Sequence, residues 1–209
     1  MTWHSYLLFC GARLVLCMSP GPDMVYLLSR CVAQGRRAGL VATLGISSGC
    51  FVHLFAAVTG LSAILATSAL AFTIIKWIGA AYLVFLGVRI LIGHAQPLNI
   101  TADGLKGASL RAVFVQGFLS DALNPKVALF FLALLPQFLP AHSAHRVQDL
   151  LVLGMTCIVI GLVFNVLLTL TSAWVTRGLR RRPRATGALQ KGMGAVFVGI
   201  GVSIAAEHA

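Results

Sequence analysis

Two charged side chains stand inside long apolar stretches, and each follows directly after a proline. Asp23 ends the motif Ser19-Pro20-Gly21-Pro22-Asp23, and Lys126 ends the motif Asp121-Ala122-Leu123-Asn124-Pro125-Lys126. An isolated charge in the middle of a bilayer costs at least ~2.5 kcal/mol, so ionisable residues in such stretches usually serve a function. Because the two charges have opposite signs, they match the ammonium and the carboxylate of an α-amino acid.

The prolines before the two charges predict the start of a helix at each position. Proline lacks a backbone N–H and favours the first position of a helix. If Pro22 and Pro125 start helices, Gly21 and Asn124 occupy the N-cap positions, and asparagine is a strong cap. The free N–H groups and positive dipole ends of two such helices would attract a carboxylate. We therefore predict a substrate site that contains these four residues and the charges of the two motifs.

Several charges near this site admit more than one interpretation. Asp23 and Lys126 either form one charge-compensated unit that binds a zwitterion or only neutralise each other, with Asp121 as a cap or a second partner. Arg13 either contacts one of these aspartates or extends to the membrane surface. His53 is either a hydrogen-bonded histidine of a helix bundle or part of a proton relay.

The composition indicates a helical membrane protein. Of the 209 residues, 58% are hydrophobic and 10% are charged, whereas soluble domains have about 25% charged residues. Runs such as residues 129–135 do not alternate between apolar and polar side chains, as a transmembrane β-barrel would require. Proline breaks in spanning segments are tolerated where protein or water satisfies the freed backbone groups, and paired breaks mark the substrate sites of transporters.

Six segments reach the length of about 20 residues that a spanning helix requires. They cover residues 5–32, 39–66, 69–92, 112–139, 148–175 and 188–206. The first and the fourth are long, as expected if each contains a break. The sequence therefore predicts an all-α polytopic membrane protein with six transmembrane helices, of which helices 1 and 4 are broken at proline.

The six predicted spans form a single membrane domain, residues 1–209, with an internal repeat. Repeat 1 covers residues 1–93 and repeat 2 covers residues 112–206. Lys76–Tyr82 and Lys191–Phe197 share the pattern Lys-x-x-Gly-Ala-x-aromatic. Because each repeat has three spans, the second is inverted in the membrane relative to the first, which is the plan of many secondary transporters.

The distribution of Lys and Arg predicts the orientation, because these residues collect in cytoplasmic loops. Twelve of the 16 lie in the connections after spans 1, 3 and 5: Arg30, Arg36, Arg37, Arg89, Lys106, Arg111, Arg177, Arg180, Arg181, Arg182, Arg184 and Lys191. These connections are therefore expected to be cytoplasmic, and both termini external. The net charge of +11 is explained in this way, together with contact with anionic lipid, and nucleic-acid binding is not expected.

Other motifs indicate packing rather than chemistry. Gly45-x-x-x-Gly49 is a small-residue face for close helix contact. The five cysteines lack the pattern of a disulfide framework or a zinc site, and His142-x-x-His145 is expected to be solvated. No phosphate-binding loop, nucleophile elbow or zinc-protease motif is present. We predict no cofactor, no metal and no enzymatic activity.

The order of the motifs resembles the LysE/RhtB family of bacterial amino-acid exporters. The resemblance is carried by Ser19–Asp23, Gly35-x-Arg37-Ala38-Gly39, Lys76–Leu83 and Leu123–Lys126, followed by Phe130 and Pro136-Gln137-Phe138. It covers essentially the whole chain. It implies a secondary transporter of the bacterial inner membrane that exports amino acids or close analogues, in exchange for protons.

The resemblance leaves Asp23 and Asp121 as rival carriers of the coupling proton. The expected partners are an amino acid, protons and membrane lipids, and a homo-oligomer is compatible with the sequence. The alternative is an exporter of a metal cation or other small ion, of a related superfamily. It would need convergent Cys, His or carboxylate ligands, for which Cys10 and Cys17, seven residues apart on one helix face, are the only hint.

We predict that Ala209 faces the outside and that the loop Arg180–Arg184 faces the cytoplasm, because of the distribution of Lys and Arg. Alkaline phosphatase fused after Ala209 should be active, and green fluorescent protein fused there should stay dark. The same fluorescent protein inserted into the Arg180–Arg184 loop should fluoresce. A fluorescent fusion at Ala209 would contradict the topology.

Overall fold

The computed structural model describes residues 3–67, 107–139 and 145–181, together with single positions between 70 and 92 and between 191 and 202. The elements in the continuous ranges are α1 (Trp3–Met18), α2 (Pro22–Thr67), α4 (Leu110–Ala122), α5 (Pro125–Leu134), the 3-10 helix η1 (Leu135–Phe138) and α6 (Arg146–Arg181). None of the described residues is in a β-strand. The predicted all-helical class is confirmed for this part of the chain.

Several described helices are long and apolar enough to cross a membrane. Pro22–Gly60 within α2 has 39 residues, and Arg146–Trp174 within α6 has 29. A third candidate span is the pair Leu110–Ala122 and Pro125–Phe138, whose axes bend by 49°. Trp3–Met18 is a shorter apolar helix. By length and composition, the described helices provide two spans, or three if the bent pair is one span. They overlap the first, second, fourth and fifth predicted spans.

The other two predicted spans, residues 69–92 and 188–206, lie outside the described residues except for single positions. The same holds for most of the Lys-x-x-Gly-Ala-x-aromatic repeat, for His142 and for Arg182–Arg184. The six-span layout with two inverted repeats therefore stays a prediction.

A bend at Gly35 separates the first two predicted spans. Gly35 has φ 82° and ψ −176°, a backbone conformation that residues with a Cβ avoid. The sequence predicts a connection from residue 33 to residue 38, whereas helix extends on both sides of this one residue. The structure differs because a single glycine turns the chain without a longer loop.

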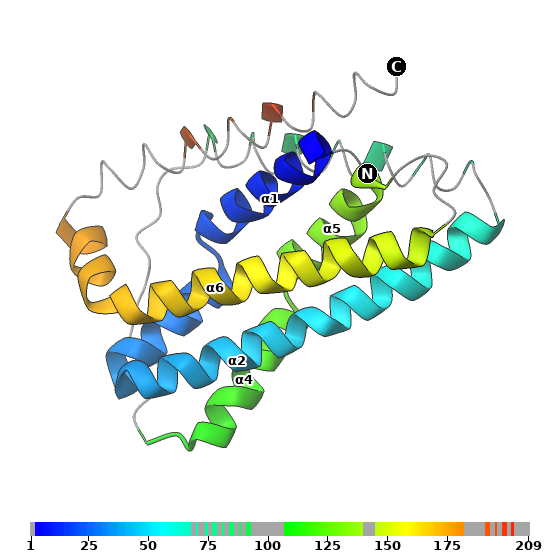
Figure 1. Ribbon diagram of the computed structural model, residues 1–209. Helices are drawn as coiled ribbons and strands as arrows, with labels where there is room; N and C mark the ends of the chain where they lie inside the picture. Colours follow the sequence, from blue (N-terminus) through cyan, green and yellow to red (C-terminus); the bar gives the residue numbers. More distant parts are fainter. Residues whose placement is uncertain are drawn as a thin grey trace.

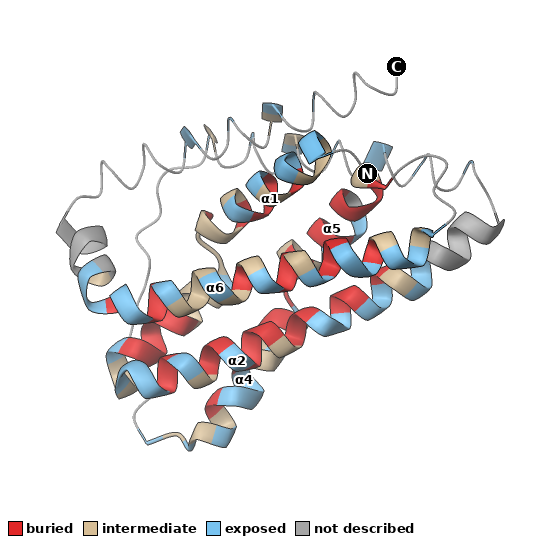
Figure 2. Ribbon diagram, viewed as in Figure 1, coloured by how far each residue is buried: buried red, intermediate tan, exposed pale blue. Residues whose placement is uncertain are grey.

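The two long helices α2 and α6 lie side by side (Figure 1), and the shorter helices pack around them. α1 contacts α6, α4 contacts α2, and α5 contacts both α2 and α4. The buried positions face the inside of this bundle, and the outer faces of α2 and α6 are exposed (Figure 2). Phe55 and Val163 on these faces are 72% and 53% exposed, as expected of side chains that meet lipid.

The buried apolar side chains form two clusters. One joins α1, α5 and α6 with the second half of α2 and includes Phe9, Leu16 and Phe130. The other joins both parts of α2 with α4 and α6 and includes Leu28 and Val113. Along the chain, each break lies between a residue of one cluster and a residue of the other: Leu16 and Leu27 flank the first break, and Val113 and Val127 flank the second.

Small residues bring α2 and α4 into close backbone contact, as the Gly45-x-x-x-Gly49 pattern predicts. A Cβ on Gly49 would lie 2.7 Å from the carbonyl oxygen of Phe118. A Cβ on Gly45 would meet the carbonyl oxygen of Phe114. From the other side, a Cβ on Gly117 would lie 2.8 Å from the carbonyl oxygen of Ala42. Since the neighbours are backbone atoms, they cannot move aside as a flexible side chain would.

We predict that Gly49→Leu destabilises the protein by at least about 1–3 kcal/mol, because overpacking would push α4 away from α2. The measurement is the thermal unfolding midpoint of purified protein in detergent. Gly11→Leu is the matched control, because Gly11 is exposed and has no neighbour that a Cβ would meet within 4 Å. Equal unfolding midpoints for the two variants would show that the close contact does not limit stability.

Candidate functional site

The first break, Ser19–Gly21, connects α1 to α2. The N–H of Val25 donates to the carbonyl of Gly21 at 3.1 Å, so helical hydrogen bonding starts from Gly21. α2 begins at Pro22, whose missing N–H would have no intrahelical partner in the first turn anyway. Gly21 and Pro22 thus occupy the predicted N-cap and first helical positions. Asp23 lies in the first turn, where the helix dipole favours an acid.

The second break, Leu123–Asn124, connects α4 to α5. α5 begins at Pro125, and Asn124 is its N-cap. The side-chain Oδ1 of Asn124 accepts the N–H of Lys126 at 3.0 Å, and its carbonyl accepts the N–H groups of Val127 and Ala128. The local sequence rules for proline and asparagine therefore describe this helix start correctly.

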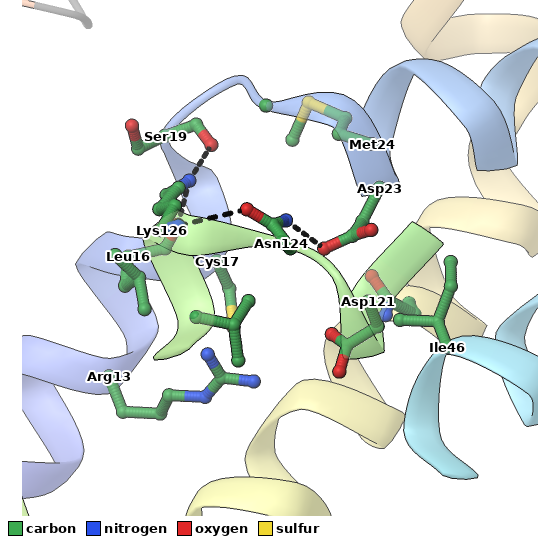
Figure 3. Close-up of a pocket in the computed structure, with 13 residues that line it drawn as sticks. Arg13, Leu16, Cys17, Ser19, Asp23, Met24, Ile46, Asp121, Asn124 and Lys126 are labelled. Atoms are coloured by element: carbon green, nitrogen blue, oxygen red, sulfur yellow. Dashed lines mark hydrogen bonds between the residues drawn. The ribbon is translucent and has the colours of Figure 1, made fainter. Parts of the chain in front are cut away.

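The two breaks lie next to each other, and Asp23 joins them (Figure 3). The amide nitrogen of Asn124 donates to Oδ2 of Asp23 at 2.6 Å, and the hydroxyl of Ser120 donates to Oδ1 at 2.7 Å. Both carboxylate oxygens are thus occupied by neutral donors from the second break and from α4. Asn124 caps α5 with its oxygen and holds the first turn of α2 with its nitrogen.

Lys126 holds the end of α1. Its ammonium donates to the carbonyl of Leu16 at 3.0 Å and to that of Ser19 at 2.6 Å. The last carbonyls of a helix lack intrahelical donors, and their partial negative charge attracts a cation. A lysine is unfavourable at the start of its own helix, and this contact with another helix explains its position. Lys126 and Asp23 form no ion pair, so the direct compensation of the two charges is not observed.

One carboxylate oxygen of Asp121, here called its open oxygen, accepts no hydrogen bond from the described residues. Its side chain is 2% exposed, and Oδ1 accepts a hydrogen bond from the thiol of Cys50 at 3.6 Å. No hydrogen bond reaches Oδ2, although Nε2 of His53 lies 3.8 Å away. That ring nitrogen donates to the main-chain oxygen of Asp121 at 2.8 Å, as expected of a hydrogen-bonded bundle histidine. A buried polar atom without a partner is rare and often marks a functional site.

Arg13 occupies neither of the positions that the sequence suggests. It is 6% exposed, so it does not extend to the surface, and it forms no ion pair with Asp23 or Asp121. Its Nε donates to the carbonyl of Cys157 in α6 at 3.0 Å, and its Cζ lies 5.7 Å from the centre of the Phe130 ring. The buried side chain of Arg13 is therefore held by a backbone carbonyl and an aromatic ring.

A cavity of about 50 Å³ lies where the breaks meet, with room for a few water molecules. Two cations and two carboxylates line it: Arg13 and Lys126, and Asp23 and Asp121. Asn165 of α6 also lines it, and its amide makes no hydrogen bond to the described part of the chain. Asn165 is not among the site residues predicted from the sequence, although a lone amide in the apolar run 161–170 is a sign of such a position.

Metal-ligating side chains do not gather in the described ranges. No three His, Cys, Asp or Glu residues there lie close enough to hold a metal ion. Cys10 and Cys17, the only hint of a cation exporter, are free thiols of intermediate exposure. The polar lining of the cavity consists mainly of charged and amide side chains.

Comparison with known proteins identifies the family. The family model of the LysE type translocator matches residues 14–208. An uncharacterized membrane protein of Vibrio cholerae is 35% identical over 209 residues, 100% of both chains. The homoserine/homoserine lactone efflux proteins of Salmonella typhimurium and Salmonella typhi are 32% and 31% identical over 99% of this chain and 98% of theirs. No solved structure gives a significant match. Since the family model covers nearly the whole sequence, the chain belongs to the LysE type translocator family.

Proposed function

We propose that this translocator exports an amino acid or a close analogue across the bacterial inner membrane in exchange for protons. Membership of the family supports transport, and the names of the two Salmonella relatives suggest homoserine as the first substrate to test. The cavity between the broken helices supports a substrate with both charge signs, because two cations and two carboxylates line it.

The open oxygen of Asp121 is the observation that carries the proposal. A buried carboxylate that faces a cavity can bind the ammonium group of a substrate, and it can equally bind a proton. It cannot bind both at once. A proton that arrives from the outer side would release the substrate there, and loss of that proton to the cytoplasm would restore the site. Competition for one carboxylate is thus sufficient for exchange.

Asp121 is better suited to this role than Asp23. Both oxygens of Asp23 accept short hydrogen bonds from Ser120 and Asn124, so an ammonium group or a proton would have to displace one of these donors. The charged and titratable groups around Asp121 are Asp23, Cys50 and His53 of α2, together with Arg13 and Lys126, which line the same cavity.

The remaining predicted site residues form the frame of the site. Gly21 and Pro22 start α2, Asn124 and Pro125 start α5, and Lys126 fixes the end of α1. This frame brings two positive helix ends to one cavity. Because the cavity has room only for a few water molecules, we infer that the helices at the breaks move apart when the substrate enters.

The test is efflux of labelled amino acids, homoserine first, from proteoliposomes that contain the purified protein. We predict that an imposed pH gradient drives efflux by the wild type. Asp121→Asn should lower this gradient-driven efflux about tenfold or more, because the amide cannot exchange a proton or pair with an ammonium. Asp149→Asn, outside the cavity at the start of α6, is the matched control and should export at the wild-type rate.

Two results would count against this proposal. A wild-type protein that moves no amino acid of the panel would exclude the substrate class. An Asp121→Asn protein that responds to the pH gradient as the wild type does would assign the coupling proton to another group.

The contact between Lys126 and the end of α1 should contribute to stability. Lys126→Met should lower the free energy of unfolding by about 1–3 kcal/mol, because the carbonyls of Leu16 and Ser19 lose their shared donor. Lys126→Arg, which keeps a donor and the charge, should lose less. The measurement is thermal unfolding in detergent, with Lys191→Met at an exposed position as the control. Unchanged stability of Lys126→Met would mean that the end of α1 does not depend on this contact.

A further inference from the structure

Arg13 is a buried cation whose hydrogen-bonding capacity is only partly used. The Nε atom donates to the carbonyl of Cys157, while the two terminal nitrogens make no hydrogen bond to the described residues. Arg13 is 6% exposed, and it lines the cavity at the breaks. A guanidinium carries five N–H donors in a planar fork. The two terminal nitrogens are therefore available to a ligand in the cavity.

The surroundings of Arg13 fix the direction of this fork. The ring of Phe130 lies against the guanidinium, and the Cys157 carbonyl binds its Nε. On α6, Gly161 follows Cys157 by one helical turn, and a Cβ at this position would meet a terminal nitrogen of Arg13. The glycine thus leaves the space that the guanidinium occupies. A side chain held on three sides loses little freedom when it binds a ligand.

We propose that Arg13 is the carboxylate receptor of this translocator, an assignment that rests on the proposed function. Arg13 and Asp121 both point into the space below the start of α5 (Figure 3) and form no ion pair. The fork of Arg13 binds the substrate carboxylate through two parallel hydrogen bonds, while Oδ2 of Asp121 binds the ammonium.

Lys126 is less suited to this role than Arg13, although it is the cation that the sequence emphasises. Two carbonyls of the α1 end already accept hydrogen bonds from its ammonium. An incoming carboxylate would have to replace these contacts and release the end of α1. Binding to Arg13 requires no such loss, because its terminal nitrogens have no competing partner in the described structure.

The assignment predicts which molecules the translocator distinguishes. A substrate with a free carboxylate gains two charge-assisted hydrogen bonds, whereas its carboxamide offers one neutral acceptor to the same fork. The wild type should therefore prefer the acid to the amide. This preference should depend on Arg13 and on the space that Gly161 provides.

The experiment compares homoserine with homoserine amide as competitors of labelled homoserine in counterflow by full-length protein in proteoliposomes. For the wild type, the concentration of homoserine that halves the counterflow of label should be at least about tenfold lower than that of homoserine amide. In Arg13→Gln the apparent affinity for the acid should fall about tenfold, while that for the amide stays unchanged. Arg36→Gln, on an exposed position of α2, should keep the wild-type preference.

Gly161→Ala provides a second variant that keeps the charge. Its methyl group would meet a terminal nitrogen of the Arg13 side chain and no backbone atom of a neighbouring helix, so it should displace the guanidinium while the fold persists. The preference for the acid should decrease, whereas Gly11→Ala at an exposed position should preserve it. Thermal stabilisation of each purified variant by acid and by amide gives the same comparison without transport.

The outcomes separate this assignment from the proposed function. Counterflow with an unchanged preference for the acid in both Arg13→Gln and Gly161→Ala would overturn the role of Arg13 and leave amino-acid export intact. An equal loss of affinity for acid and amide would show that Arg13 only supports the structure. A wild-type protein that neither transports nor is stabilised by any amino acid of the panel would overturn both.

Discussion

The structure of this translocator depends on one constraint: backbone groups freed at a helix break in an apolar environment need partners. The first break receives partners from the second, while the backbone groups of the second pair within their own segment. Lys126, in the first turn after the second break, binds the last carbonyls of α1, and Asn124 at that break binds Asp23 in the first turn of α2. These contacts hold the two breaks together, and the site between them follows from the same contacts.

The four charges around the cavity fall into two groups with different tasks. Both oxygens of Asp23 and two of the three ammonium donors of Lys126 bind neutral partners, and these contacts hold the helices in place. Arg13 and Asp121 are more deeply buried, and each keeps atoms that no described residue binds. Desolvation makes buried polar atoms without partners costly, and a membrane protein retains them where a ligand or a proton binds to these atoms.

Local features of the sequence predict the helix starts at Pro22 and Pro125 and the close contact at Gly45 and Gly49, because proline, asparagine and glycine act through their own backbone geometry. The choice of partners could not be predicted in this way. Which carbonyl Arg13 binds depends on how α1 packs against α6, over 144 residues of separation. The role of Lys126 at the end of another helix, and the presence of Asn165 at the cavity, likewise depend on tertiary packing.

The glycine contact between α2 and α4 also has a consequence for motion. Because α2 and α4 touch through backbone atoms at these glycines, we expect the second half of α2 and α4 to move together as one rigid body. The hinges of any opening then lie at its borders, at Gly35 and at the turn Leu123–Asn124. Asp121 belongs to the rigid body and Arg13 to α1, on the other side of the cavity. Opening would therefore change the separation of these two charges, and with it the affinity of the proposed site for its substrate.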